Sequence, residues 1–256
     1  MPYFERLDEG RFRATEEVSG AWRIEEQHIA PALGLLAHEV LRDHERRREE
    51  RLLLSRVSYD LLGTVPVAEV EIEVRVVRPG RTIELVEAAL THAGRPIVRM
   101  RAWLLQAHET AGIGGSPFAP LPLPEELAVW DPTSVWPGGF IASVELRRDQ
   151  VEPGRARFWV RPRTPLLDGE PVSELAAYVG VLDIANGMTV RADPRTVAFP
   201  NVDLTAHFFT EPRGAWVGFD TRVSFGSSGL GLTSSVIHDV QGPVGTLNQS
   251  LTVRPG

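Results

Sequence analysis

The chain has 256 residues, of which 43% are hydrophobic and 24% are charged, and its formal net charge at pH 7 is −7. This acidic balance argues against a nucleic-acid-binding protein, whose contact surface is basic, and no apolar run approaches the roughly 20 residues that span a bilayer. The charged start MPYFERLDEGRF lacks the apolar core of a secretory signal. We therefore expect a cytoplasmic protein with neither a membrane nor a nucleic acid as its partner.

Two residue types are missing, and each absence removes a class of chemistry. Without cysteine there is no thiol nucleophile, no Cys-ligated zinc and no redox disulfide. Without lysine there is no Schiff base with a substrate or with pyridoxal phosphate, and no P-loop. The seven histidines show no metal-ligand spacing, so the sequence predicts no metal and no cofactor.

The first half of the sequence predicts one long helix between antiparallel strands. A strand-like segment, GRFRATEEV, starts at Gly10, and a helix follows over residues 27 to about 44, because apolar residues recur there every three or four positions. Residues 67–77 alternate between apolar and mostly charged side chains, the pattern of a strand with one buried face. Residues 81–105 predict two more strands, joined by a turn at Ala93 and Gly94.

The second half repeats this order at a nearly constant distance along the chain. ARFWVRPRT stands where GRFRATEEV stood, and SELAAYVGVLDIANG predicts the second helix, with Ser173 as its N-cap and Gly187 at its end. An offset of 146 residues relates the pairs Phe12/Phe158, Gly34/Gly180 and Pro66/Pro212. Beyond these prolines the strands need an offset of 147, which places one inserted residue in the turn.

The repeat predicts how the chain is divided. We expect an N-terminal unit over residues 1–110, a Gly- and Pro-rich linker over residues 111–145, and a C-terminal unit over residues 146–256. A long helix beside an antiparallel sheet must bury its apolar face against that sheet, which predicts an α+β fold. Two such units would pair their sheets edge to edge, and the exposed faces that remain predict a homo-oligomer.

Positions that are apolar in one copy and polar in the other are candidates for a functional site, because burial alone does not explain them. Three such positions lie in the second copy: Asp203 in the place of Val57, Ser224 in the place of Val77, and Gln249 in the place of Ala102. Gln249 shares a strand face with leucines, where an amide without a hydrogen bond is costly. The alternatives are a turn or cap carboxylate for Asp203, and strand ends near solvent for Ser224 and Gln249.

The same region resembles a known family. NVDLTAHFF, WVGFDTRVS and GTLNQSLTVR are similar to the C-terminal half of double-hotdog acyl-CoA thioesterases of the thioesterase II type, and EEQHIAPALGLLAHEV is similar to the N-terminal helix segment of their actinobacterial relatives. The resemblance implies a tandem (double) hotdog fold and an acyl-CoA substrate. It also implies that an Asp, a Ser or Thr, and a Gln position the water that attacks the thioester, without a covalent intermediate. These roles fall on Asp203, Ser224 and Gln249, with Ser227 and Ser228 close to the second of them.

Other residues compete for roles in such a site. Asp183, inside the predicted second helix, is either a rival catalytic carboxylate or a charge on the helix surface. His28, at the start of the first helix, either contacts the thioester carbonyl or caps the helix, and backbone N–H groups of residues 27–34 are candidate oxyanion donors. The run HERRREER at residues 44–51 either binds the 3′-phosphate of coenzyme A or is a solvated helix end.

Two other functions compete with thioester hydrolysis. One is a non-catalytic protein that binds acyl groups or other hydrophobic ligands on the same fold. The other is an acyl-CoA hydratase, which is disfavoured because no Asp and His lie at close spacing after a helix start. A serine hydrolase is rejected because no G-x-S-x-G nucleophile elbow is present.

Overall fold

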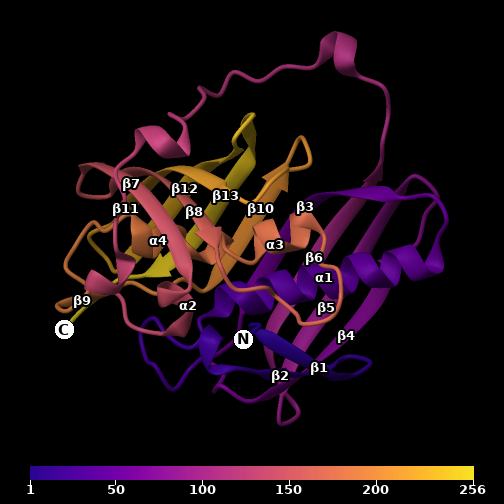
Figure 1. The fold of residues 1–256 in the computed structure, drawn as a ribbon, viewed down its shortest axis with the longest axis horizontal. Helices are drawn as coiled ribbons and strands as arrows, with labels where there is room; N and C mark the ends of the chain where they lie inside the picture. Colours follow the sequence, from indigo (N-terminus) through magenta and orange to yellow (C-terminus); the bar gives the residue numbers. More distant parts are fainter.

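The computed structural model describes residues 1–256 and is dominated by one 12-stranded sheet. Every pair of neighbouring strands in it is antiparallel, and the order is β1-β2-β4-β5-β6-β3-β10-β13-β12-β11-β8-β7 (Figure 1). Its strands are β1 (Phe4–Asp8), β2 (Arg11–Ala14), β3 (Leu52–Leu61), β4 (Glu69–Arg78), β5 (Ile83–His92), β6 (Arg95–Gln106), β7 (Val144–Glu152), β8 (Arg155–Pro162), β10 (Asp203–Phe208), β11 (Val217–Phe225), β12 (Leu230–Asp239) and β13 (Gly242–Thr252). A second sheet pairs β9 (Val197–Ala198) with β14 (Arg254–Pro255).

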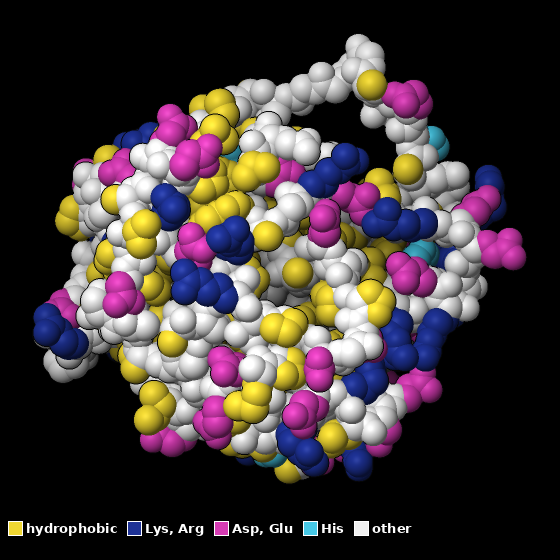
Figure 2. All heavy atoms as spheres, in the orientation of Figure 1, with side chains coloured by type: hydrophobic (Ala, Val, Ile, Leu, Met, Phe, Trp, Pro, Cys, Tyr) yellow, Lys and Arg dark blue, Asp and Glu magenta, His cyan; other side chains and the backbone are white.

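Helices form a smaller part of the structure. They are α1 (Ile29–Arg47), α2 (Gly139–Ala142), α3 (Glu174–Val179) and α4 (Ala185–Met188), with single 3-10 turns at Glu16–Val18, Ala111–Ile113, Pro124–Glu126, Pro132–Ser134 and Leu182–Ile184. None of these helices has the length and hydrophobicity of a membrane-spanning helix. Acidic and basic side chains are intermixed over the face of the molecule seen in Figure 2.

The sheet has the same strand order in its two halves, read outward from the centre. The two halves of the sheet meet where β3 pairs with β10. At this seam the hydroxyls of Ser58 and Thr205, which are 147 residues apart, form a hydrogen bond of 2.9 Å. The same offset relates the pair Val86/Ala102 in the first half to the pair Thr233/Gln249 in the second.

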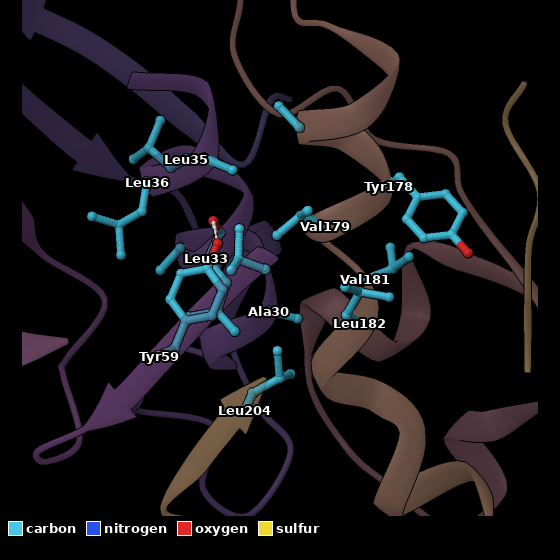
Figure 3. Packing of buried hydrophobic residues seen from close by; sticks show 14 of the residues in the cluster. Ala30, Leu33, Leu35, Leu36, Tyr59, Tyr178, Val179, Val181, Leu182 and Leu204 are labelled. Atoms are coloured by element: carbon cyan, nitrogen blue, oxygen red, sulfur yellow. Dashed lines mark hydrogen bonds between the residues drawn. The ribbon is translucent and has the colours of Figure 1, made fainter. Parts of the chain in front are cut away.

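The first helix lies where the apolar spacing predicts it. α1 spans Ile29–Arg47, and both Leu33 and Leu36 on its apolar face are fully buried. Figure 3 shows Leu33 of α1 beside Val179 of α3, Leu36 on the other side of α1, and Tyr59 of β3 below the helix. The Tyr59 hydroxyl donates a hydrogen bond of 3.0 Å to the carbonyl of Leu33, so a polar contact fixes the helix on the sheet as well as apolar burial.

The second helix is shorter than predicted. Its N-cap is Ser173, as expected, and the hydroxyl accepts a hydrogen bond from the backbone N–H of Ala176. The helix ends at Val179 with Gly180 as its C-cap, where it packs closely against α1: a Cβ added to Gly34 would lie 2.6 Å from the Gly180 Cα. The chain then makes a 3-10 turn and continues as α4. Asp183 lies in this turn, and the interruption of the helix therefore changes the direction in which its side chain points.

The predicted linker is only partly free of the body of the molecule. After β6 the chain arches away and returns along the second half, as Figure 1 shows for the segment that includes the turn Ala111–Ile113. Further on, the carbonyl of Pro122 accepts a hydrogen bond of 2.8 Å from the Trp159 indole, and Val129 forms a bridge with Arg147 at the edge of β7. The later part of the linker therefore covers the outer edge of the sheet.

Candidate active site

Gln249 lies on the buried face of β13 and binds a carboxylate of the second helical segment. Its side chain is fully buried, in line with Leu247 and Leu251. The amide Nε2 donates a hydrogen bond of 3.0 Å to Oδ1 of Asp183. The amide oxygen has no protein partner, and neither has the buried hydroxyl of Thr233, which lies opposite Gln249 in β12. A hydrogen bond to a charged acceptor therefore offsets part of the cost of burying this amide.

Asn201 supplies a second amide to the same carboxylate. It lies just before β10 and forms a bridge with Leu251 of β13. Its Nδ2 donates a hydrogen bond of 2.6 Å to Oδ1 of Asp183 and one of 3.1 Å to the backbone carbonyl of Asp203. These two acceptors define the orientation of the amide. Both amides bind Oδ1, and no protein group forms a hydrogen bond with Oδ2 of Asp183.

The environment of Asp183 suits proton transfer near neutral pH. The residue is only 6% exposed. Burial raises the pKa of Asp183 to about 7, and the hydrogen bonds from Asn201 and Gln249 lower it only in part. A carboxyl group with such a pKa is ionised in a large fraction of molecules at neutral pH and still binds a proton readily. This is the property required of a general base.

Asp183 and Asn201 line a pocket with a volume of about 240 Å³, built from both halves of the chain. The first half contributes residues 20–23, the start of α1 and residues 63–65, and the second half contributes residues 183, 184 and 186–188. Trp22 packs edge-on against Trp136 and Phe199, with ring centroids 4.8 Å and 5.4 Å away. The pocket therefore combines an aromatic wall with polar and charged side chains, among them Arg23 and Glu26.

His28 adds a neutral donor to this pocket. It is the N-cap of α1, and its Nδ1 accepts a hydrogen bond of 3.2 Å from the backbone N–H of Ala30. Burial lowers the pKa of His28 to about 3, so the ring is neutral at physiological pH. Since Nδ1 is the acceptor, the proton of the neutral ring lies on Nε2, which has no protein partner. His28 thus caps the helix and also lines the pocket.

Comparison with known proteins identifies the family. Residues 18–105 match the N-terminal domain of acyl-CoA thioesterases, and residues 124–253 match the C-terminal domain. The chain belongs to the acyl-CoA thioesterase family. No curated protein matches it. The protein is accordingly an enzyme that hydrolyses thioesters.

Three solved structures with low sequence identity have a similar fold. A protein of unknown function with a hot dog fold from Alicyclobacillus acidocaldarius is 15% identical, with a TM-score of 0.76 over 98% of this chain and 96% of that one. The acyl-CoA thioesterase II TesB2 of Mycobacterium marinum is 17% identical, with a TM-score of 0.69 over 99% and 96%. The tesB protein of Mycobacterium avium subs paratuberculosis is 18% identical, with a TM-score of 0.67 over 98% and 96%. The thioesterase therefore has a hotdog fold, with an antiparallel sheet and few helices.

The three site residues expected from the sequence of this thioesterase do not converge. Asp203 lies on the face of β10 opposite to the buried Leu204, and its carboxylate accepts a hydrogen bond of 2.5 Å from the backbone N–H of Ser250. Ser224 is exposed on β11. Gln249 alone faces the pocket side, bound to Asp183, so the alternative of a strand end near solvent is wrong for it.

A shift of one residue explains why Asp203 was expected on the wrong face. Val57 lies opposite Ala102 in the pair β3–β6, and the register of β10 and β13 continues to place Leu204 opposite Gln249. Leu204, and not Asp203, therefore occupies the place of Val57. The inserted residue lies between the second helix and β10. The pair Pro66/Pro212 had placed it later in the chain, after Pro212. Because strand side chains alternate between faces, a shift of one residue moves every side chain to the other face.

The residues that do surround the carboxylate are also polar in the second copy where the first copy has an apolar residue. With the helix offset of 146, Asp183 takes the place of Ala37, and with the strand offset of 147, Asn201 takes the place of Leu54. Both counterparts are buried in the first half, and so is Ala102, the counterpart of Gln249. The first half thus has an apolar side chain at each of the three places, and the second half alone has the acid and the amides.

Proposed function

We propose that Asp183 is the general base for hydrolysis of an acyl-CoA thioester, held by Asn201 and Gln249. The observation that carries this proposal is the buried carboxylate with a pKa of about 7, bound at one oxygen by two amides and lining a pocket. The resemblance in the sequence implies an Asp, a Ser or Thr, and a Gln. From the sequence these roles fall on Asp203, Ser224 and Gln249; we keep Gln249 and assign the other two roles to Asp183 and Asn201.

The chemistry needs a water molecule and a proton acceptor, but no covalent intermediate. Asp183 takes a proton from water through Oδ2 while the water oxygen bonds to the thioester carbonyl carbon, giving a tetrahedral oxyanion. The oxyanion collapses, the carbon–sulfur bond breaks, and the proton on Asp183 passes to the departing thiolate. The products are a carboxylic acid and the free thiol of coenzyme A, and the carboxylate is restored.

The two amides orient the base. Because Asn201 and Gln249 both bind Oδ1, the free Oδ2 is the oxygen available to the water. They also favour the ionised form of Asp183 over the neutral form, against the effect of burial. Without them the pKa would rise further, and less of the base would be ionised at neutral pH.

The oxyanion would be stabilised from the first half of the chain. The neutral His28 ring lines the pocket and has an unpartnered Nε2–H that could donate to the oxyanion, and the positive end of the α1 dipole lies at the same place. Donors fixed before the reaction stabilise developing negative charge without reorganisation. Each half would then have a distinct role: the first provides the oxyanion donors and the second provides the base.

The proposal includes the organisation of the chain as a tandem hotdog. Residues 1–110 and 146–256 would each form one unit, with residues 111–145 as the connection. The shared strand order and the offset of 147 residues across the seam support this division. Assembly into a homo-oligomer stays a prediction.

Release of free thiol from a panel of acyl-CoAs tests the function directly. Asp183→Asn is expected to abolish most of the release, and Asp203→Asn, on the opposite face of the sheet, is the matched control that retains it. Thiol release by Asp183→Asn at the wild-type rate would refute the proposed base.

A further inference from the structure

Arg148 is a half-buried arginine to which the protein offers no anionic partner. It lies on β7, and its guanidinium carbon stands 4.2 Å from the centre of the Trp130 ring. Its side chain makes no ion pair and no hydrogen bond to the protein, and its Nε is buried without a partner. Burial lowers the pKa of Arg148 to about 10, since no carboxylate offsets the loss of water.

The other basic residues discussed as phosphate ligands are already paired. In the run at residues 44–51, Arg46 binds Glu9, Arg47 binds Asp43 and Glu84, Arg48 lies 3.6 Å from Glu84, and Arg51 binds Glu211. These ion pairs favour the interpretation of the run as a solvated helix end over that of a phosphate site. Arg148 differs because its charge is not compensated.

Arg148 lines a second pocket, with a volume of about 390 Å³. Asp193 and Arg195 also line it, and they bind each other at 2.7 Å, so together they contribute no net charge. Arg148 leaves the pocket with one positive charge. Trp130 provides an aromatic surface beside that charge.

This pocket lies next to the active-site pocket along two segments of the chain, although no residue lines both. Val135 lines the second pocket and the next residue, Trp136, lines the first. In the other segment Val190 lines the second pocket and Met188 the first. Two residues of chain span at most about 7 Å, so the linings of the two pockets lie within about that distance of each other along both segments.

We propose that the pocket at Arg148 binds a phosphate group of the coenzyme A part of the substrate while the thioester lies at Asp183. This inference rests on the proposed function. A planar guanidinium presents paired N–H donors that match phosphate oxygens, and half-buried charge strengthens the contact. Arg148 would then distinguish a coenzyme A thioester from a thioester of a small thiol.

The test compares thioesters of one acyl chain with coenzyme A, with 4′-phosphopantetheine and with pantetheine. Arg148→Met keeps the stem over Trp130 and removes the charge. Because a hydrogen bond to a charged group is typically worth a factor of roughly 10 to 100, we expect the KM for acyl-CoA to rise by about that factor. The kcat should stay the same, and hydrolysis of acyl-pantetheine should not change. The phosphopantetheine thioester shows which phosphate is bound: an effect as large as with acyl-CoA assigns the phosphate next to pantetheine, and a smaller effect assigns another.

The matched control is Arg147→Met, one residue away on the opposite face of β7. It removes the same charge and lies 3.9 Å from Glu145, so it should leave all three substrates unaffected. Arg148→Lys should recover part of the loss, because it restores the charge without the planar donor pair. Thermal unfolding of Arg148→Met should not occur at a lower temperature, since the variant removes an unpaired half-buried charge.

Calorimetric titration with coenzyme A itself separates this inference from the proposed function. If the wild-type protein releases no thiol from any thioester, the proposed function fails, but weaker binding of coenzyme A by Arg148→Met still supports the phosphate pocket. The inference is overturned if Arg148→Met binds coenzyme A as tightly as the wild type does. It is also overturned if Arg147→Met weakens binding equally, or if the wild type does not bind coenzyme A.

Discussion

Replacing Asp183 by Asn should inactivate the thioesterase and at the same time stabilise its fold. The substitution keeps an oxygen that accepts the hydrogen bonds from Asn201 and Gln249 and removes only the ionisable group. Loss of a positioned general base typically lowers turnover by about 10²–10⁴-fold. A gain in stability would show that this loss does not come from misfolding.

The stability change follows from the pKa. Folding raises the pKa of Asp183 from 3.8 to about 7, so the folded state binds the proton more tightly than the unfolded state does. Such a group destabilises the fold progressively as pH rises from the unfolded pKa to the folded pKa, and the cost is constant above that. At 1.36 kcal/mol per pKa unit, the full cost is about 4 kcal/mol at pH 8 and about 1 kcal/mol at pH 4.5.

The assay is the free energy of unfolding of wild type and variant, measured at both pH values, together with thiol release at pH 8. Asp183→Asn should be more stable than wild type at pH 8 by up to about 4 kcal/mol, with most of the difference lost at pH 4.5. Asp203→Asn, the control, should show neither change. The assignment of a raised pKa to Asp183 would be refuted by an inactive variant whose difference in unfolding free energy from wild type is the same at pH 8 as at pH 4.5.

Three further predictions concern the same site and the assembly. The logarithm of kcat/KM for acyl-CoA should rise with pH up to about 7 and then level off. Gln249→Leu should raise the pH at which it levels off by about 1–2 units, because the hydrogen bond that is lost favours the ionised acid. An unchanged pH profile would mean that Gln249 does not act on the base. His28→Phe should lower kcat by about 10²–10³-fold, the usual effect of losing an oxyanion donor, and unchanged turnover would exclude His28 from the oxyanion contact. Light scattering should give a mass above the 28.3 kDa of one chain, and a monomer at micromolar concentration would contradict the predicted homo-oligomer.

Residue pattern alone determined the large features of this protein, because they depend on periodicity. The apolar spacing of α1, the alternation along β4 and the turn at Ala93 and Gly94, both with positive φ, were all predictable. So was the pairing of the two halves at β3 and β10, since unpaired sheet edges are unfavourable in water. Comparison of the two copies also selected Gln249, because a buried amide in an apolar strand face requires a hydrogen-bond partner.

Only the tertiary structure shows which acid forms a hydrogen bond with the amide of Gln249. Strand alternation identifies a face only when the register is known, and one inserted residue before β10 put Asp203 on the wrong side. The break after Gly180, where α1 and α3 touch, turns Asp183 toward the sheet, and the pattern of a continuous helix does not reveal it. The raised pKa of Asp183 likewise depends on burial by segments far apart in the chain, and no local stretch of residues specifies that burial.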